Sequence, residues 1–124
     1  MEKDFAPYEE ALALKELGFD EPCFKYIYVG DTGNNIDHYL EVVPSKAKNY
    51  NEDSLSISQP TFSQSFRWFR EKHKLGAIVS QFGWGIENEF GQIIHNISDA
   101  ENPLCYEEAE LECLKRLIEI ANEK

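Results

Sequence analysis

Three histidines carry the side chains of this sequence that most readily exchange protons near neutral pH: His38, His73 and His95. A histidine activates a nucleophile as its general base, and none of the three has a nucleophile at a known motif spacing. The sequence also has no glycine-rich phosphate loop, no G-x-S-x-G and no H-E-x-x-H. A small hydrolase-like enzyme that uses a histidine (His73 or His95) and a nearby carboxylate is therefore the hypothesis with the least support in the sequence.

Asp31-Thr32-Gly33 is the triplet that carries the reactive carboxylate in aspartic proteases, where two such groups share a proton. That pattern continues with Ser or Ala, whereas Asn34 follows here, and Gly, Asn and Asp are typical of a hairpin turn. The segment also offers oxygen ligands for calcium, but the twelfth position from Asp31, where an EF-hand has Glu, is Val42. We interpret it as a turn, with a different calcium geometry as the remaining alternative, and expect no metal and no cofactor.

Basic residues are concentrated in the segment 66–74. Arg67, Arg70 and Lys74 lie off the apolar stripe of a predicted helix, on its outward side, where they could bind a phosphate or carboxylate group of a partner. The alternative is a solvated helix face on which Arg67 pairs with Glu71, four residues later. Arg67 and Arg70 are therefore candidate partner-binding residues.

Two tryptophans are candidate aromatic anchors of a binding surface. Trp68 lies well off the centre of the stripe of phenylalanines on the same predicted helix. Trp84 stands between two glycines, which can mark a bulge or the close approach of another chain or ligand. Packing in the core is the alternative role for both Trp68 and Trp84.

The chain has 23 acidic and 12 basic residues, which gives a formal net charge of −11. This charge repels phosphate groups, so we expect no direct nucleic-acid binding and no contact with anionic membranes. Between residues 99 and 112 there are six acidic residues and no basic residue. They suit the first turns of a helix, and they also motivate an alternative function, an acidic nucleic-acid mimic that binds a basic DNA-binding protein.

The length of 124 residues predicts one domain, 1–124, large enough for a hydrophobic core. The odd number of cysteines (Cys23, Cys105 and Cys113) argues against a disulfide framework, and we expect buried free thiols. The charged amino terminus does not resemble a signal peptide, and no apolar stretch is long enough for a membrane span. We therefore expect a cytoplasmic protein.

Apolar spacing predicts three helices, over 7–17, 60–73 and 103–122, and each opens with a proline in its first turn. Leu111, Leu114 and Ile118 give the last helix a second apolar edge. That edge either packs against a sheet or forms the seam of a homodimer through the C-terminal helix, and the sequence leaves both alternatives open.

Aromatic and β-branched residues predict two strand pairs. The first consists of strands at 23–29 and 36–43, joined by a turn at 30–35. The second runs from Gly76 to Ile86 and returns from Phe90 to Ile97.

The polar segment 44–59 is predicted to be a long flexible loop, since it has few apolar anchors. The predicted order of elements is α-ββ-α-ββ-α. This order predicts an α+β fold with an antiparallel sheet of about four strands and with the helices packed mainly on one face.

Three segments resemble small hypothetical proteins of bacterial phage and prophage genomes. They run from Tyr8-Glu9-Glu10-Ala11 to Cys23, from Pro60-Thr61-Phe62 to Lys72, and from Tyr106-Glu107-Glu108-Ala109 to Ile118. The resemblance covers most of the chain outside the asparagine-rich loops. That group has no assigned activity, so the resemblance implies a mobile element in a bacterial cytoplasm and carries over no catalytic residue.

The leading functional hypothesis is a non-enzymatic accessory or protein-interaction domain of a phage or mobile element. It depends on the missing catalytic motifs, the acidic charge and the two candidate aromatic anchors. The expected partner is an unidentified protein, or a second copy of the chain through the C-terminal helix.

Overall fold

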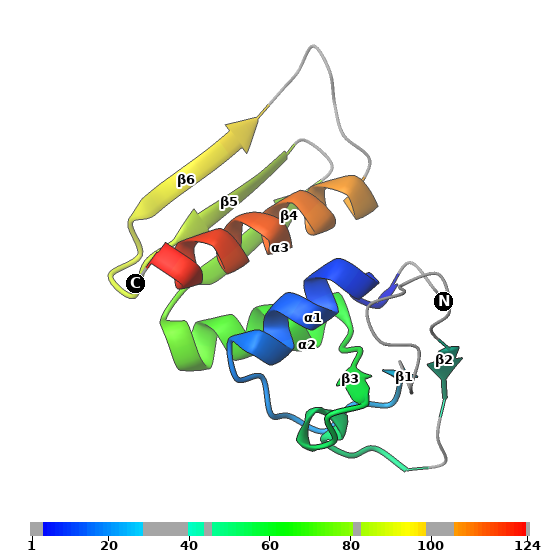
Figure 1. Ribbon diagram of the computed structural model, residues 1–124. Coiled ribbons are helices and arrows are strands. Elements are labelled where there is room, and N and C mark those ends of the chain that lie inside the picture. Colours follow the sequence, from blue (N-terminus) through cyan, green and yellow to red (C-terminus); the bar gives the residue numbers. More distant parts are fainter. Residues whose placement is uncertain (1–3, 29–39, 44–45, 81–82, 99–105, 124) are drawn as a thin grey trace. The chain divides into compact units, whose positions relative to one another are not determined.

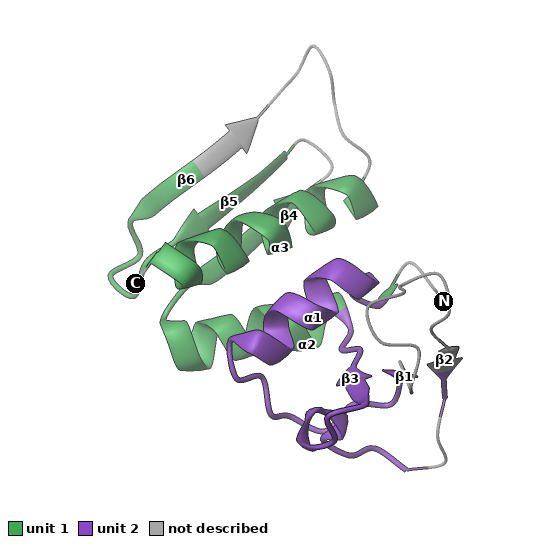
Figure 2. Ribbon diagram, in the orientation of Figure 1, with its two compact units in different colours: residues 1–4, 62–124 green, residues 5–61 purple. Residues whose placement is uncertain are grey.

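The computed structural model describes residues 4–28, 40–43, 46–80, 83–98 and 106–123 (Figure 1). The chain divides into two compact units (Figure 2): unit 1 comprises residues 1–4 and 62–124, and unit 2 comprises residues 5–61. Each unit has a small antiparallel sheet of three strands against which a helix packs. The α+β class predicted from the sequence is confirmed.

Unit 2 contains one α-helix, α1 (Tyr8–Glu16), and a sheet in the order β2-β1-β3. The strands are β1 (Tyr26–Tyr28), β2 (Leu40–Val42) and β3 (Ser56–Ser58). The antiparallel β1–β2 pairing confirms the first predicted strand pair, with shorter strands. The turn predicted at 30–35 lies outside the described residues. Ala11 of α1, Ile27 of β1 and Ile57 of β3 form the buried apolar cluster that joins the helix to the sheet.

The prediction of a long flexible loop over 44–59 is wrong. That segment contains a short 3-10 helix, η4 (Tyr50–Glu52), and β3, which pairs antiparallel with β1. A strand reading Ser-Ile-Ser has little apolar content in its sequence, and yet all three of its residues are buried. The polar composition of 56–58 therefore did not predict this edge strand, because burial of a serine depends on hydrogen bonds that no apolar pattern reveals.

Side-chain hydrogen bonds hold this polar segment in place. Ser58 Oγ accepts a hydrogen bond from the backbone N–H of Tyr50 at 2.8 Å, and the N–H of Ser58 donates to Asn51 Oδ1 at 2.8 Å. From α1, Lys15 Nζ donates to the carbonyl oxygen of Ser56 at 2.7 Å. Asparagine and serine thus act here as structural partners of the backbone.

Unit 1 contains α2 (Phe62–Trp68), the π-helix η5 (Phe69–His73) that continues it, and α3 (Tyr106–Glu123). Its sheet has the order β4-β5-β6, with β4 (Gly76–Ser80), β5 (Gly83–Glu87) and β6 (Ile93–Ser98). α3 packs against β4 and β5, and α2 packs against α3 and β4. The helix predicted over 60–73 is confirmed, as is the described part of the one predicted over 103–122.

The single strand predicted from Gly76 to Ile86 is wrong, because this segment forms two strands, β4 and β5, that pair with each other. Val79 lies opposite Trp84, and Ala77 lies opposite Ile86. Cross-strand partners share a face of the sheet, so Val79 lies on the face of Trp84 and Ile78 lies on the opposite face, whereas alternation along one strand would put Ile78 and Trp84 together. The chain therefore has two sheets of three strands in the order α-βββ-α-βββ-α, and the predicted sheet of about four strands is not formed.

Two of the three cysteines are buried free thiols, as predicted: Cys23 in unit 2 and Cys113 on α3. Cys105 lies outside the described residues. Burial raises the pKa of Cys23 and of Cys113 to about 12. Both thiols are therefore protonated at neutral pH, which makes them poor nucleophiles.

The second apolar edge of α3 is turned into the protein, because Leu114 and Ile118 are buried and Leu111 is half-buried. This burial agrees with the packing alternative, and a homodimer through the C-terminal helix stays a prediction. Among the helices of the described ranges, α3 included, none combines the length and the apolar character needed to cross a bilayer.

Candidate functional site

Both tryptophans that the sequence offered as partner anchors are buried. Trp68, the last residue of α2, is 3% exposed, and its ring lies 4.9 Å from that of His73. Trp84 of β5 is 4% exposed and stacks on His95 of β6 with ring centroids 4.9 Å apart. The structure thus favours the packing alternative for Trp68 and Trp84.

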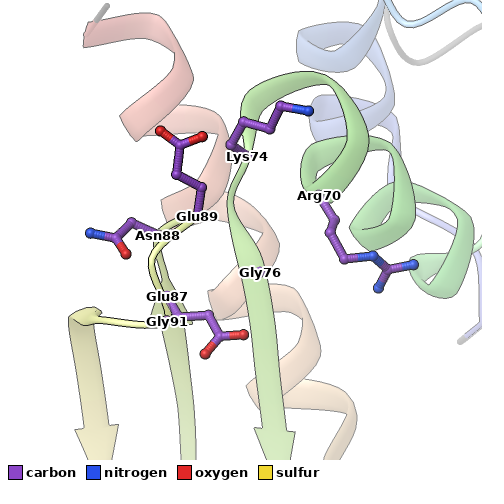
Figure 3. Close-up of a pocket in the computed structure, with 7 residues that line it drawn as sticks. All are labelled: Arg70, Lys74, Gly76, Glu87, Asn88, Glu89 and Gly91. Atoms are coloured by element: carbon purple, nitrogen blue, oxygen red, sulfur yellow. The ribbon is translucent and has the colours of Figure 1, made fainter.

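A pocket of about 370 Å³ lies in unit 1, between the end of η5 and the connection from β5 to β6 (Figure 3). Arg70 lines this pocket, whereas Arg67 is exposed on α2 and does not line it. The lining residues come from η5 and its end, from the start of β4, and from the end of β5 and the turn after it: Arg70, Lys74, Gly76, Glu87, Asn88, Glu89 and Gly91.

Lys74 ends η5 and directs the chain into β4. Its backbone is left-handed, with φ 59° and ψ 36°, and its N–H donates to the carbonyl oxygen of Phe69. A residue with a side chain pays about 1–2 kcal/mol for this conformation. The site therefore holds a strained lysine where glycine would fit without strain.

Lys74→Gly is expected to leave the free energy of unfolding unchanged or to raise it by up to about 1 kcal/mol, because relief of strain exceeds the added entropy of the unfolded chain. The matched control is Lys72→Gly within η5, which is expected to lower the same quantity by about 1 kcal/mol. Urea denaturation measures the free energy of unfolding of each variant. Equal losses in the two variants would contradict a strained Lys74.

Charges of both signs line the pocket, and they come from opposite sides of it (Figure 3). Arg70 and Lys74 extend from η5 and its end, while Glu87 and Glu89 extend from the end of β5 and the following turn. Within the described part of the chain, none of these four side chains forms an ion pair.

Gly76 allows the Glu87 side chain to lie across the start of β4. The two residues are cross-strand partners, and a Cβ at position 76 would lie 3.0 Å from Glu87 Cγ and 3.1 Å from Glu87 Oε1. A larger residue at position 76 would displace the half-buried Glu87. The absence of a side chain at position 76 thus leaves room for the Glu87 carboxylate beside the start of β4.

The turn of residues 88–92, called the Phe90 turn below, adjoins the pocket. Asn88 Oδ1 accepts hydrogen bonds from the N–H groups of Phe90 at 2.9 Å and Gln92 at 3.0 Å, and the N–H of Asn88 donates to the carbonyl oxygen of Gln92 at 2.9 Å. Gly91 supplies the positive φ, +78°, that the turn requires. The result is a firmly bonded turn that presents Phe90 with 79% of its surface exposed.

No family model, no curated protein and no solved structure matches this chain.

The residues considered for catalysis do not meet at this pocket. Neither His73 nor His95 lines it, and both rings pack against tryptophan. Over the described residues, no three His, Cys, Asp or Glu side chains are grouped so that they could hold a metal ion. His38 and Asp31-Thr32-Gly33 lie outside those residues.

The sequence pattern predicts Phe90 at the start of a returning strand, and it does not single out Glu87 and Glu89 as pocket residues. A signal was present, because Asn at the first position and Gly at the fourth position of a turn are typical of type I turns. Asn88 and Gly91 occupy those positions, and they place Phe90 at the tip. The pocket itself depends on the reversal between β4 and β5, which the sequence did not reveal.

Proposed function

We propose that this chain is a non-enzymatic protein-interaction domain that binds a partner protein through Phe90 and the charged pocket beside it. The observation that carries the proposal is the 79% exposure of Phe90 on a turn fixed by the Asn88 hydrogen bonds. An aromatic side chain has a large apolar surface, and its burial against a partner is strongly favourable. Aromatic anchors of this kind provide much of the binding energy in protein interfaces.

The fixed turn reduces the entropy that binding would otherwise cost. A flexible loop must be ordered when a partner binds, at about 0.5–1.5 kcal/mol for each side chain that is immobilised. Here Asn88 already holds the backbone N–H groups of Phe90 and Gln92. The turn therefore presents Phe90 in one backbone conformation before the partner arrives.

The pocket provides a polar rim next to this apolar anchor. Arg70 and Lys74 can bind a carboxylate of the partner, and Glu87 and Glu89 can bind a basic side chain. Exposed ion pairs contribute little affinity, but they restrict which partner segment fits. Arg70 thus retains the partner-binding role predicted for it, now beside Phe90 in place of Trp68.

Affinity capture with immobilised protein from host-type bacterial lysate, followed by mass spectrometry, tests this function. The expected result is one dominant protein that remains bound in high salt, because apolar contacts are not screened. Phe90→Ala is expected to weaken that interaction by about 30-fold, which corresponds to about 2 kcal/mol for an aromatic anchor.

Phe24→Ala is the matched control, because Phe24 is a phenylalanine of unit 2 with 67% exposure. This variant is expected to capture the same protein as the unmodified chain. Equal retention by Phe90→Ala, Phe24→Ala and the unmodified chain would remove Phe90 from the interface. Loss of the captured protein in high salt, with no effect of Phe90→Ala, would favour the acidic mimic of nucleic acid.

The biological setting of this function is a bacterial phage or mobile element, and only the resemblance of three segments to phage and prophage proteins supports that part of the proposal. The acidic composition agrees with a basic or mixed-charge partner.

A further inference from the structure

The outer edge of β6 has no partner strand among the described residues. The sheet order is β4-β5-β6, so β5 occupies one side of β6 and no described strand lies on the other. The opposite edge strand, β4, is in contact with α2, η5 and α3. Backbone N–H and C=O groups along an unpaired edge attract another strand, because a strand supplies hydrogen-bonding groups in a matching row.

Devices that protect natural sheet edges are largely missing from β6. Its residues, Ile93 to Ser98, include no lysine, no other charged residue and no proline. Ile93 is 52% exposed and Ile94 is 46% exposed. The register shift against β5 lies at the start of the strand, opposite Ile86 and Glu87, and the pairing is regular from His95 to Ser98.

We propose that β6 pairs antiparallel with β6 of a second copy of this chain. An antiparallel strand can pair with itself about a twofold axis, so the same uncharged strand is present on both sides of the contact. This matters in a chain of net charge −11, whose copies repel each other over most surfaces. β6 is an uncharged edge, and the pairing joins two three-stranded sheets into one sheet of six strands.

The dimer goes beyond the proposed function and does not depend on it. Phe90 lies in the turn before β6, and antiparallel pairing places the two Phe90 turns at opposite ends of the joined strands. Such a dimer would present two partner-binding turns. Capture of a partner and dimer formation are therefore separate properties that different substitutions affect.

Sedimentation equilibrium of the full chain over a wide concentration range tests the proposal. We expect a reversible dimer. We expect Ile94→Lys to raise its dissociation constant at least about tenfold, because each copy then has a positive charge on the strand that pairs. Ile78→Lys is the matched control, since Ile78 is 45% exposed on the edge strand β4. That variant is expected to dimerise like the unmodified chain, as is Phe90→Ala.

Hydrogen exchange of the unmodified protein provides a second measurement that needs no variant. Backbone amides of residues 93–98 are expected to exchange more slowly as the protein concentration rises, while those of β4 do not change. A monomer at every concentration, or equal effects of Ile94→Lys and Ile78→Lys, would overturn the proposal. Dimerisation without concentration-dependent protection of β6 would also overturn it and would place the contact elsewhere, for example on the C-terminal helix.

Discussion

Phe69→Ala is expected to lower the free energy of unfolding of unit 1 by about 3–5 kcal/mol. Phe69 is the first residue of η5 and is 0% exposed, and its ring packs at 5.1 Å from Trp68 and 5.5 Å from His73. Removal of a fully buried ring loses its apolar burial and leaves a cavity that its neighbours fill only in part. Urea denaturation followed by tryptophan fluorescence measures the loss, because Trp68 and Trp84 both report on this unit.

Phe66→Ala is the matched control for this substitution. Phe66 belongs to the same predicted stripe, but it is half-buried, and its ring lies 6.2 Å from that of Phe62. We expect a loss of about 1–2 kcal/mol, because less apolar surface is removed from contact. Equal losses for Phe66→Ala and Phe69→Ala would contradict the placement of Phe69 in the core.

Alkaline pH is expected to destabilise the protein through its two buried thiols. In the folded state the pKa of Cys23 and of Cys113 is about 12, against an ordinary value of 9.0 for an exposed thiol. The folded state therefore holds these protons more tightly than the unfolded state does. Their contribution to stability is complete below pH 9 and decreases as the pH rises toward 12, by on the order of 1 kcal/mol per pH unit for each thiol.

Free energies of unfolding measured between pH 8 and pH 10.5 test this dependence. Cys23→Ala and Cys113→Ala are each expected to make the decline with pH shallower than in the unmodified chain, whatever their cost at pH 7. The comparison of slopes separates the thiols from tyrosines and lysines that also titrate in this range. The same slope in all three proteins would contradict tight burial of the thiols.

Helices were predictable because their signals are local. Apolar residues three and four positions apart, with Pro7 as the N-cap of α1 and Pro60 two residues before α2, predict both helices from the local sequence. The end of the π-helix η5 was not predictable in this way. Lys74 has a left-handed backbone there, and this conformation belongs to the change of direction into β4. Local pattern therefore predicted the helix but not how it ends.

The sheets were harder to predict because pairing depends on distant residues. β3 is held in place by the hydrogen bonds of Ser58 with Tyr50 and Asn51. Its Ile57 packs in the core of unit 2. The division of 76–86 into β4 and β5 was not predicted, because Ile78, Phe82, Trp84 and Ile86 alternate along the sequence as in one continuous strand, although the pairing puts Ile78 on the face opposite Trp84.

The candidate site was predicted only in part for the same reason. Aromatic residues were recognised as important, but sequence alone does not distinguish a buried ring such as Trp84 from an exposed one such as Phe90. That distinction depends on the fold, because Trp84 lies on the central strand of its sheet and Phe90 lies in the turn that follows. Of the four predicted residues, Arg70 is the one that the structure brings to the pocket.

Site-specific photo-crosslinking tests the central claim, that Phe90 contacts a partner protein, most directly. p-Benzoylphenylalanine replaces Phe90 in one protein and the exposed Phe24 in another, and both are irradiated in host-type bacterial lysate. The predicted result is one dominant adduct with a second protein from position 90, with no corresponding adduct from position 24. Adducts of equal yield from both positions, or no adduct from position 90, would contradict the assignment of the Phe90 turn as the binding surface.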